Sequence, residues 1–326
     1  MKKLTSLEIT LLNQLGDGAC HSGKDLGLLL GVSRTAVWKH IKQLATMGLT
    51  INSLPQKGYQ LNGPLTLLDS KVIQALLPKA LVNNFVFHIY GSIDSTNLYL
   101  RKIPPTDSVE VCCAETQTEG RGRFGRKWVS LFGENIYCSS RWQFHNDLSC
   151  LSGLSLIVSL ALIKTLTSFT SENLFIKWPN DILWNNKKLC GSLIEINGES
   201  HGGAEVIIGI GLNVNTNTQT ITLADKPWCS LLEITQKHFD RNAIIAKLLT
   251  TLSDYLSRFS QEGLLTFMDE WKKYDYLYGK KITLSHISGK YTGIAQGINE
   301  LGQLKLRDDQ GVLHLLSSGD TSIREQ

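Results

Sequence analysis

Residues 4–45 contain short stretches in which apolar side chains recur at helical spacing. These stretches span residues 4–14, 22–30 and 34–45. The turn Gly31-Val32-Ser33 separates the second from the third, and its glycine suits the left-handed conformation that a tight turn requires. Ser33 is a suitable N-cap for the third helix. The pattern therefore predicts a helix-turn-helix.

Two alternating runs, 49–54 and 59–61, follow the third predicted helix and flank a Pro/Gly turn, which predicts a β-hairpin. A hairpin in this place makes a winged helix with Lys57 at the tip of the wing. Outward residues of the third helix can reach base edges and phosphates. The predicted DNA-binding residues are Ser33, Arg34, Thr35, Trp38, Lys39, Lys42 and Lys57. The alternative is a three-helix module that packs against the rest of the protein and does not bind DNA.

The positive charge of the chain is concentrated in this segment. Residues 1–65 hold seven Lys/Arg against three acidic residues, and the formal net charge of the whole chain is +4, so the remainder is balanced. A local basic surplus is what a phosphate-facing surface needs. Charge alone does not decide between nucleic acid as a partner of the N-terminal segment and an ordinary solvated face on a small domain.

The overall composition indicates a folded cytoplasmic protein. Hydrophobic residues make up 42% and charged residues 19%, which argues against disorder. The apolar stretch 151–163 is too short to span a membrane, and no signal peptide is recognisable. Seven cysteines without a C-x-x-C motif indicate reduced thiols, and neither disulfides nor zinc. We expect no membrane association.

Strand and helix patterns mix between residue 65 and about 271. We expect helices at 151–166 and 248–259 and strands at 85–90, 109–114, 174–178, 182–184, 191–196 and 206–213. Several of the strands follow one another too closely for crossover helices. The order therefore predicts an α+β domain with a largely antiparallel sheet.

A glycine- and arginine-rich segment, 120–128, carries the strongest chemical signal. Its glycines match G-x-G-x-x-G, but its cations are Arg121, Arg123, Arg126 and Lys127. A dinucleotide fingerprint leaves phosphates to backbone N–H groups at a helix start, and no helical pattern follows here. Glycines let a backbone close in on a ligand, and guanidinium groups grip phosphate bidentately. The segment predicts an anion-binding loop, with an ordinary exposed basic loop as the alternative.

Two further segments combine cations with polar groups. Lys177-Trp178-Pro179-Asn180-Asp181 places a cation and a carboxylate around a rigid turn, and Lys187-Lys188 follows. Such a set suits a nucleotide with bound Mg²⁺, in which a lysine faces the α-phosphate and Asp181 holds the metal or accepts a proton. Asn213, after two glycines at the end of a strand, is able to read an adenine edge. The alternative is that these segments are ordinary turns, which would have similar sequences without binding a ligand.

Together these segments resemble a known family. They read STN at 95–97, EGRGRFGRKW at 119–128, KWPND at 177–181, KLCG at 188–191 and GIGLN at 209–213. In this order they resemble biotin protein ligases. With the winged helix ahead of them, the chain resembles the bifunctional bacterial form, which is both a biotin ligase and the repressor of the biotin operon (the BirA family).

The resemblance implies a multidomain α+β fold. A winged helix-turn-helix domain would cover residues 1–64, and a mixed α/β catalytic domain like that of class II synthetases would cover 65–272. An SH3-like β-barrel would cover 273–326, with strands at 281–284, 291–297, 304–307 and 312–316.

The resemblance also implies a two-step reaction. The biotin carboxylate attacks the α-phosphorus of ATP to give biotinyl-5′-AMP and pyrophosphate, and a lysine amine of a biotin carboxyl carrier protein then displaces AMP. Cations must screen the approaching anions, which points to Arg121, Lys188 and Mg²⁺. Asp181 would hold the metal or orient the amine.

The resemblance further implies the ligand-binding residues. Biotin would contact Ser95, Thr96, Asn97, Gln117, Gly120, Arg121, Lys188 and Gly191. ATP and the adenylate would contact Arg123, Arg126, Trp128, Lys177, Asn180, Asn213, Trp228 and Arg324. Biotinyl-5′-AMP would act as corepressor by ordering the glycine-rich loop, which favours a homodimer that places two winged helices on operator DNA.

The sequence departs from the family pattern at two positions. Phe124 stands where another arginine is usual, and Cys190 stands where alanine or glycine is usual. Both changes bear on ligand affinity more than on the type of reaction. The alternatives at this stage are a lipoate-type protein ligase, a ligand-sensing transcription regulator with an inactive ligase domain, and a ligase with a vestigial N-terminal domain.

Overall fold

The computed structural model describes residues 1–144, 151–198, 203–217, 227–286 and 289–323. The chain forms two compact units: residues 1–141, 209–224 and 230–246 make up the first, and 142–208, 225–229 and 247–326 the second. The predicted domain boundaries at 64/65 and 272/273 stay predictions. Among the described residues, no helix is both long and apolar enough to cross a membrane.

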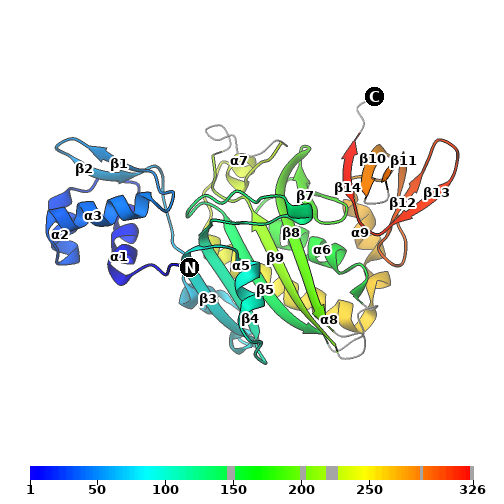
Figure 1. Cartoon of the computed structure of the whole chain (residues 1–326), viewed down its shortest axis with the longest axis horizontal. Helices are drawn as coiled ribbons and strands as arrows, with labels where there is room; N and C mark the ends of the chain where they lie inside the picture. Colours follow the sequence, from blue (N-terminus) through cyan, green and yellow to red (C-terminus); the bar gives the residue numbers. More distant parts are fainter. Residues whose placement is uncertain (145–150, 199–202, 218–226, 287–288, 324–326) are drawn as a thin grey trace. The chain divides into compact units, whose positions relative to one another are not determined.

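The winged helix-turn-helix predicted for the N-terminal region lies in the first unit (Figure 1). Its elements are α1 (Ser6–Leu15), α2 (Gly23–Leu30), α3 (Arg34–Ala45), β1 (Ile51–Leu54) and β2 (Gly58–Leu61). Gly31 has a φ of 64°, and Ser33 accepts a 3.2 Å hydrogen bond from the backbone N–H of Ala36, as its N-cap position predicts. The inner faces of the helices bury one apolar cluster that includes Leu11, Leu12, Leu15, Leu26, Val37 and Leu44.

The hairpin β1–β2 is fastened to the segment before α2. His21 and Tyr59 exchange backbone hydrogen bonds of 2.9 Å in both directions. Gly58, between the wing tip and Tyr59, has a φ of 139°, and a Cβ atom there would lie 2.0 Å from the carbonyl oxygen of His21. A glycine is therefore required at this position, and it fixes where the wing leaves the helices.

The first unit also contains the opening strands of the ligase region. Strands β3 (Phe85–Ile93) and β4 (Val109–Gln117) are parallel, and β5 (Ile136–Phe144) is antiparallel to β4. Strands β3 and β4 are thus a parallel exception to the prediction of a largely antiparallel sheet. Their connection is long enough for a crossover because it contains the short helix α5 (Thr96–Lys102), which the apolar pattern did not reveal.

The second unit contains an antiparallel run of strands and a buried helix. Strand β7 (Asp181–Trp184) pairs antiparallel with both β6 (Phe175–Lys177) and β8 (Lys187–Gly198). These pairings, together with β4–β5, are antiparallel, which confirms the prediction of a largely antiparallel sheet. Helix α6 (Leu154–Leu166) is apolar and buried along nearly its whole length, which confirms the core helix predicted at 151–166. Other elements of the ligase region are α4 (Ser70–Leu76), β9 (Ala204–Leu212), α7 (Leu231–Thr235), α8 (Arg241–Glu262), α9 (Met268–Tyr274) and the 3₁₀ turns Val82–Asn84, Arg123–Gly125 and Leu264–Phe267.

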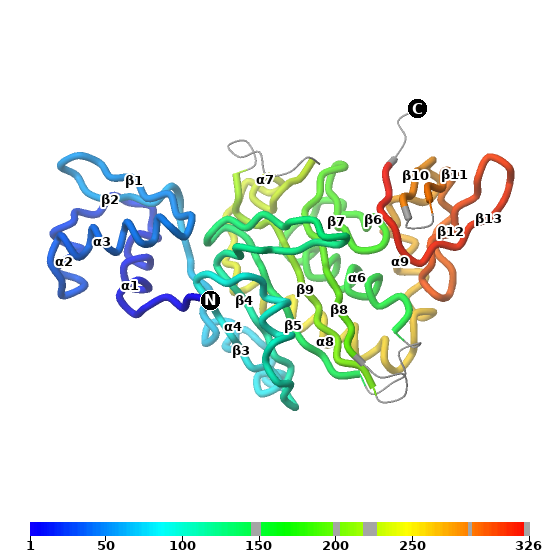
Figure 2. Tube along the Cα trace, viewed as in Figure 1, coloured from blue at the N-terminus to red at the C-terminus, as the bar shows by residue number. Residues whose placement is uncertain are grey.

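The C-terminal strands form a small antiparallel sheet, drawn in orange to red in Figure 2. Its strands are β10 (Lys281–His286), β11 (Gly289–Ile298), β12 (Leu304–Arg307), β13 (Leu313–Leu316) and β14 (Asp320–Ile323), in the order β13-β12-β11-β10-β14. The turn between β11 and β12 touches a motif of the ligase region, because the indole N–H of Trp178 donates a 3.0 Å hydrogen bond to the carbonyl of Gly302. The two segments thus belong to one packed unit.

Candidate active site

A buried polar cluster lies at the carboxyl ends of β3 and β4. Because these strands are parallel, Thr96 at the start of α5 and Gln117 at the end of β4 meet at one edge. The backbone N–H and hydroxyl of Thr96 both donate to Oε1 of Gln117, at 2.9 and 3.1 Å. The hydroxyl of Ser139 lies 2.6 Å from the hydroxyl of Thr96 and 2.5 Å from Oδ1 of Asn97. The structure thus brings together predicted biotin-side residues Thr96, Asn97 and Gln117, with Ser95 buried beside them.

Strand β9 passes close to this cluster because it lacks side chains at two positions. A Cβ atom on Gly209 would lie 2.1 Å from Oδ1 of Asn97, and one on Gly211 would lie 2.4 Å from the indole ring of Trp128. Asn213, predicted to face the adenylate, follows directly after β9 and is buried. The glycines of the GIGLN motif therefore serve close packing against predicted ligand-binding residues.

The arginine–glycine segment forms a closed loop. The backbone N–H of Trp128 donates to the carbonyl of Gly120 at 2.9 Å, and that of Gly122 donates to the carbonyl of Arg126 at 2.7 Å. A Cβ atom on Gly120 would lie 2.4 Å from the carbonyl oxygen of Trp128, so this glycine allows the loop to close. A helix does not follow the glycines, as predicted. Arg121 and Arg126 are exposed, which leaves their guanidinium groups accessible to an anion.

Phe124, the departure from the family pattern, sits at the tip of this loop. Its backbone is left-handed, with a φ of 57°, and its ring is 56% exposed. The guanidinium carbon of Arg123 lies 5.0 Å from the centre of this ring. The phenylalanine thus replaces a usual cation with an aromatic surface that stacks on a remaining one.

In the second unit, a lysine and a carboxylate pair across the hairpin that follows the KWPND motif. Nζ of Lys188 lies 2.7 Å from Oδ1 of Asp181, and the two side chains are 32% and 27% exposed. Gly191 is opposite Asp181 in the ladder, and a Cβ atom there would lie 2.9 Å from Nζ of Lys188. The missing side chain at Gly191 therefore gives the lysine its path to the carboxylate. Lys177 pairs with Asp181 in the β6–β7 register.

Two other predicted residues, Trp228 and Asn180, lie near the Lys188–Asp181 pair in the chain or in the backbone pairing. Lys188 exchanges backbone hydrogen bonds with the neighbours of Trp228, donating to the carbonyl of Pro227 at 3.0 Å and accepting from Cys229 at 2.9 Å. The side-chain amide of Asn180 donates to the carbonyl of Ser192 at 2.6 Å. Asn180 thus fixes the turn before Asp181, while Trp228 lies beside Lys188. Arg324 lies outside the described residues.

Cys190, the second departure, is fully buried in β8. Burial raises the pKa of its thiol, so it stays protonated at neutral pH and packs as a small apolar side chain. It does not add a nucleophile to the site.

The predicted DNA-binding residues all lie on the exposed side of the winged helix. Ser33, Arg34, Thr35, Trp38, Lys39, Lys42 and Lys57 are each solvent-exposed. Trp38 is 48% exposed, and Nζ of Lys42 lies 5.8 Å from the centre of its ring. An exposed aromatic side chain with cations beside it suits a nucleic-acid surface, although single exposed apolar residues are common, so the DNA contact stays a prediction.

Comparison with known proteins matches both parts of the chain. Residues 90–213 match the Biotin/lipoate A/B protein ligase family, and residues 8–60 match an HTH domain. The bifunctional ligase/repressor BirA of Salmonella typhimurium is 37% identical over 325 residues, and the alignment covers 99% of each chain. The Escherichia coli BirA is 34% identical over 99% of this chain and 98% of its own.

The chain belongs to the BirA family of bifunctional ligases and repressors.

It is therefore an enzyme, a ligase, that also carries a helix-turn-helix domain of a repressor. The fold of the ligase part agrees with this family. The biotin protein ligase of Aquifex aeolicus, solved with biotin and ATP, superposes with a TM-score of 0.62 at 28% identity, covering 74% of this chain and 99% of that chain. The family model includes biotin and lipoate ligases alike.

Several residues that build the site carry no signal in the sequence. Ser139 bridges Thr96 and Asn97, yet it lies in a strand, β5, that was not predicted. Asn135, Glu115 and Arg241 are also buried polar residues near the site, and they belong to none of the recognised motifs. Their partners are distant in the sequence, so no local signal could have identified them.

Proposed function

We propose that this BirA-family chain activates biotin with ATP and transfers it to a lysine of a biotin carboxyl carrier protein. The observation that carries the proposal is that each unit holds cations beside polar groups. The first unit has the exposed loop that bears arginines and is closed by backbone hydrogen bonds, and in the second unit Lys188 pairs with Asp181 past Gly191, which has no side chain. Each arrangement offers positive charge of the kind that a ligand's phosphate or carboxylate requires.

In the first step, a carboxylate oxygen of biotin attacks the α-phosphorus of ATP, and pyrophosphate leaves with the electron pair of the broken P–O bond. Two anions must approach each other, so the reaction needs fixed positive charge at the developing pentavalent phosphorus. Arg121 and Lys188 supply this charge. The buried hydroxyl and amide groups around Thr96 and Gln117 orient the uncharged part of biotin through hydrogen bonds.

In the second step, the amine of the carrier lysine attacks the acyl carbon of biotinyl-5′-AMP, an amide bond forms, and AMP leaves. The attacking amine must lose a proton, and Asp181 is placed to orient or accept it. Since Asp181 is paired with Lys188, movement of the lysine towards the adenylate would release the carboxylate for this role.

The ligand contacts of the site follow from the resemblance to biotin protein ligases. Biotin is contacted by Ser95, Thr96, Asn97, Gln117, Gly120, Arg121, Lys188 and Gly191. The adenylate is contacted by Arg123, Arg126, Trp128, Lys177, Asn180, Asn213, Trp228 and Arg324. Three of these have mainly structural contacts of their own: Asn180 to Ser192, Gly120 to Trp128 and Gly191 to Lys188.

Mg²⁺ fits the site only as a metal shared with ATP. Among the described residues there is no group of three or more His, Cys, Asp or Glu side chains placed to hold a metal. Mg²⁺ at phosphoryl-transfer sites is usually held by one or two carboxylates together with substrate phosphates. Asp181 is the carboxylate that this proposal assigns to it, and the bound ion would neutralise phosphate charge.

The proposal for the N-terminal region is repression of biotin synthesis genes. Biotinyl-5′-AMP acts as corepressor by favouring a homodimer, and the dimer presents two copies of α3 to two half-sites of operator DNA. The exposed Trp38 and its neighbouring cations support the DNA contact.

Intact-mass measurement tests the ligase activity directly. The full chain is incubated with ATP, Mg²⁺, a biotin carrier domain and either biotin or lipoate. We expect the carrier to gain one biotinyl group, and no lipoyl group, with pyrophosphate released. Lipoyl transfer in place of biotinyl transfer would show that the acid is lipoate and that biotin is wrongly assigned. Absence of both products would indicate a ligand sensor with an inactive ligase domain.

Operator binding tests the repressor role separately. Mobility-shift measurements with biotin operator DNA are made with biotin and ATP together and with each alone. Tight binding is expected only with both. Equal affinity under all conditions would contradict the corepressor assignment.

A further inference from the structure

Asn135, a fully buried residue just before β5, holds the segment that follows Asn213. Its side-chain oxygen accepts two hydrogen bonds, from the backbone N–H of Val214 at 2.8 Å and from the hydroxyl of Thr216 at 2.9 Å. The residue between these two is fixed as well, because the backbone N–H of Asn215 donates to the carbonyl of Glu134 at 2.9 Å. One amide side chain and its neighbour thus hold one side of the backbone directly after β9, while the backbone N–H of Leu232 and the hydroxyl of Ser230 donate to the carbonyls of Val214 and Thr216 on the other side.

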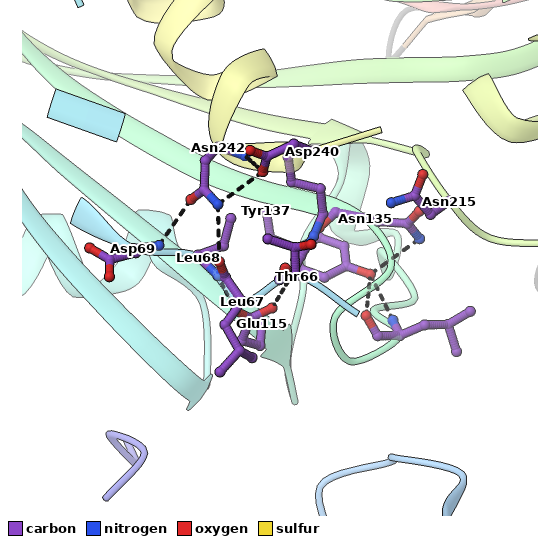
Figure 3. Close-up of polar contacts among 12 residues, drawn as sticks. Thr66, Leu67, Leu68, Asp69, Glu115, Asn135, Tyr137, Asn215, Asp240 and Asn242 are labelled. Carbon is purple, nitrogen blue, oxygen red and sulfur yellow. Dashed lines mark hydrogen bonds and ion pairs between the residues drawn. The ribbon is translucent and has the colours of Figure 1, made fainter. Parts of the chain in front are cut away.

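Asn135 is itself fixed by the buried cluster in Figure 3. Nη1 of Arg241 donates to the carbonyl of Asn135 at 3.1 Å, and Nη2 lies 2.7 Å from Oε2 of Glu115. The amide N–H of Asn135 donates to the hydroxyl of Tyr137 at 3.3 Å. Because the backbone carbonyl, the amide oxygen and the amide nitrogen are all engaged, the side chain has one favourable orientation.

The segment so held borders the ligand-binding residues of the first unit. Gly209 and Gly211 of β9 allow close approach to Asn97 and Trp128, and Asn213 comes two residues later. The backbone N–H of Leu231 donates to the carbonyl of Asn213 at 3.1 Å, which fixes that residue from the other side. A shift of residues 214–216 would therefore move Asn213 relative to Asn97 and Trp128.

We propose that Asn135 is a positioning residue for the nucleotide: through Val214 and Thr216 it places Asn213 where the adenine half of ATP binds. This inference rests on the proposed function, which assigns Asn213 to the adenylate. Asn135 acts only through the segment that it holds, so its loss changes the affinity for ATP far more than the affinity for biotin.

The test compares Michaelis constants in biotin-dependent pyrophosphate release by the full-length chain. Asn135→Ala removes both hydrogen bonds to the segment, and we expect the KM for ATP to rise at least fivefold while the KM for biotin stays within twofold. Asn135→Asp keeps the accepting oxygen and is expected to restore most of the ATP affinity. Thr216→Val removes one of the two bonds without changing the shape of the side chain, and a two- to threefold rise is expected.

Tyr137→Phe is the matched control. It removes the hydrogen bond from the amide nitrogen of Asn135 and the bonds between the phenol and the backbone of Leu131, but it leaves the amide oxygen engaged. A comparable loss of thermal stability is expected, with the KM for ATP within twofold of the wild type.

Two results would overturn this inference and leave the proposed function standing. One is an unchanged ratio of the two KM values in Asn135→Ala and Thr216→Val. The other is a rise in the KM for ATP in Tyr137→Phe as large as the rise in Asn135→Ala. If Asn135→Ala fails to fold, Thr216→Val decides by the same ratio. Absence of pyrophosphate release by the wild type would instead overturn the proposed function, and this inference with it.

Discussion

The winged helix and the ligase region are held together in different ways. In the winged helix, the polar contacts that cap the three helices join neighbours: Thr5 with Glu8, Ser22 with Asp25 and Ser33 with Ala36. In the ligase region, Arg241 reaches the carbonyls of Asn135 and Thr66, which are 106 and 175 positions away. Local contacts can be read from the sequence and removing one costs little, whereas distant buried contacts are hidden from it and removing one partner of a buried ion pair costs much.

The largest expected effect comes from breaking the buried ion pair between Arg241 and Glu115 in the ligase region. Arg241→Ala leaves the Glu115 carboxylate buried without its cation, so we expect a loss of about 3–5 kcal/mol in the free energy of unfolding. Denaturant unfolding with both circular dichroism and tryptophan fluorescence measures it. The double variant Glu115→Gln/Arg241→Met, which removes both charges, is expected to recover part of the loss. A loss below about 1 kcal/mol in Arg241→Ala would remove the contrast between the two regions.

A second variant separates chemistry from stability in the ligase region. Lys188→Ala removes a cation that the mechanism places at the reacting phosphate, so we expect kcat for pyrophosphate release to fall on the order of 10²–10³-fold. The side chain of Lys188 is partly exposed and forms its ion pair with a partly exposed carboxylate, so the melting temperature is expected to change little. The solvent-exposed Lys164→Ala in α6 serves as the control and should leave kcat unaffected. An unchanged kcat in Lys188→Ala would contradict its catalytic assignment.

In the winged helix, loss of a single cap gives a smaller effect. Ser33→Ala removes the acceptor for the backbone N–H of Ala36 at the start of α3, which costs about 1 kcal/mol. Thermal melting of the full-length chain and operator titration should both register the change, since α3 presents the DNA-binding residues. Ser33→Asp retains an accepting oxygen and is expected to restore stability but not DNA affinity, because it adds a negative charge. Undiminished operator affinity in Ser33→Asp would argue against contact between this end of α3 and phosphate.

The smallest effect concerns pH and the capping box of α1. Burial raises the pKa of the Glu8 carboxyl, but hydrogen bonds and charge from Lys2 and hydrogen bonds from Thr5 outweigh burial and hold the pKa below its usual value of 4.5. The resulting stabilisation is present at neutral pH and is lost as pH falls through the lowered pKa. The stability difference between wild type and Glu8→Gln is therefore expected to be under about 1 kcal/mol at pH 7 and to vanish towards pH 3. A stability difference that grows as the pH falls would show that the pKa of Glu8 is raised and not lowered.

The same contrast explains which features the sequence revealed. The turn at Gly31, the cap at Ser33 and the apolar helix α6 follow from local pattern, and the structure confirms them. The parallel pairing of β3 with β4 did not follow, because the short helix α5 has no strong apolar period of its own. The strand β5 was missed altogether, and with it Ser139.

Only those residues of the candidate site that lie in recognised motifs could be predicted from the sequence. Thr96 and Gln117 were assigned to biotin by resemblance, and the structure joins them by two hydrogen bonds. Their bridging partner Ser139 and the positioning residue Asn135 depend on strand pairing and on contacts across more than 40 positions. Information of this kind resides in the tertiary fold, and a single sequence does not display it.

The hydrogen bond between Trp178 and Gly302 has a consequence for engineering the chain. Gly302 has a φ of 74°, and a Cβ atom there would lie 2.9 Å from the Cα atom of Gly153, so the turn that carries it cannot change length without withdrawing the acceptor from a ligase motif. The next turn, around Asp309, Gln310 and Gly311, is exposed on the same small sheet. A peptide tag grafted at 309–311 is expected to leave ligation intact, while the same tag at 300–302 would disturb it from a distance.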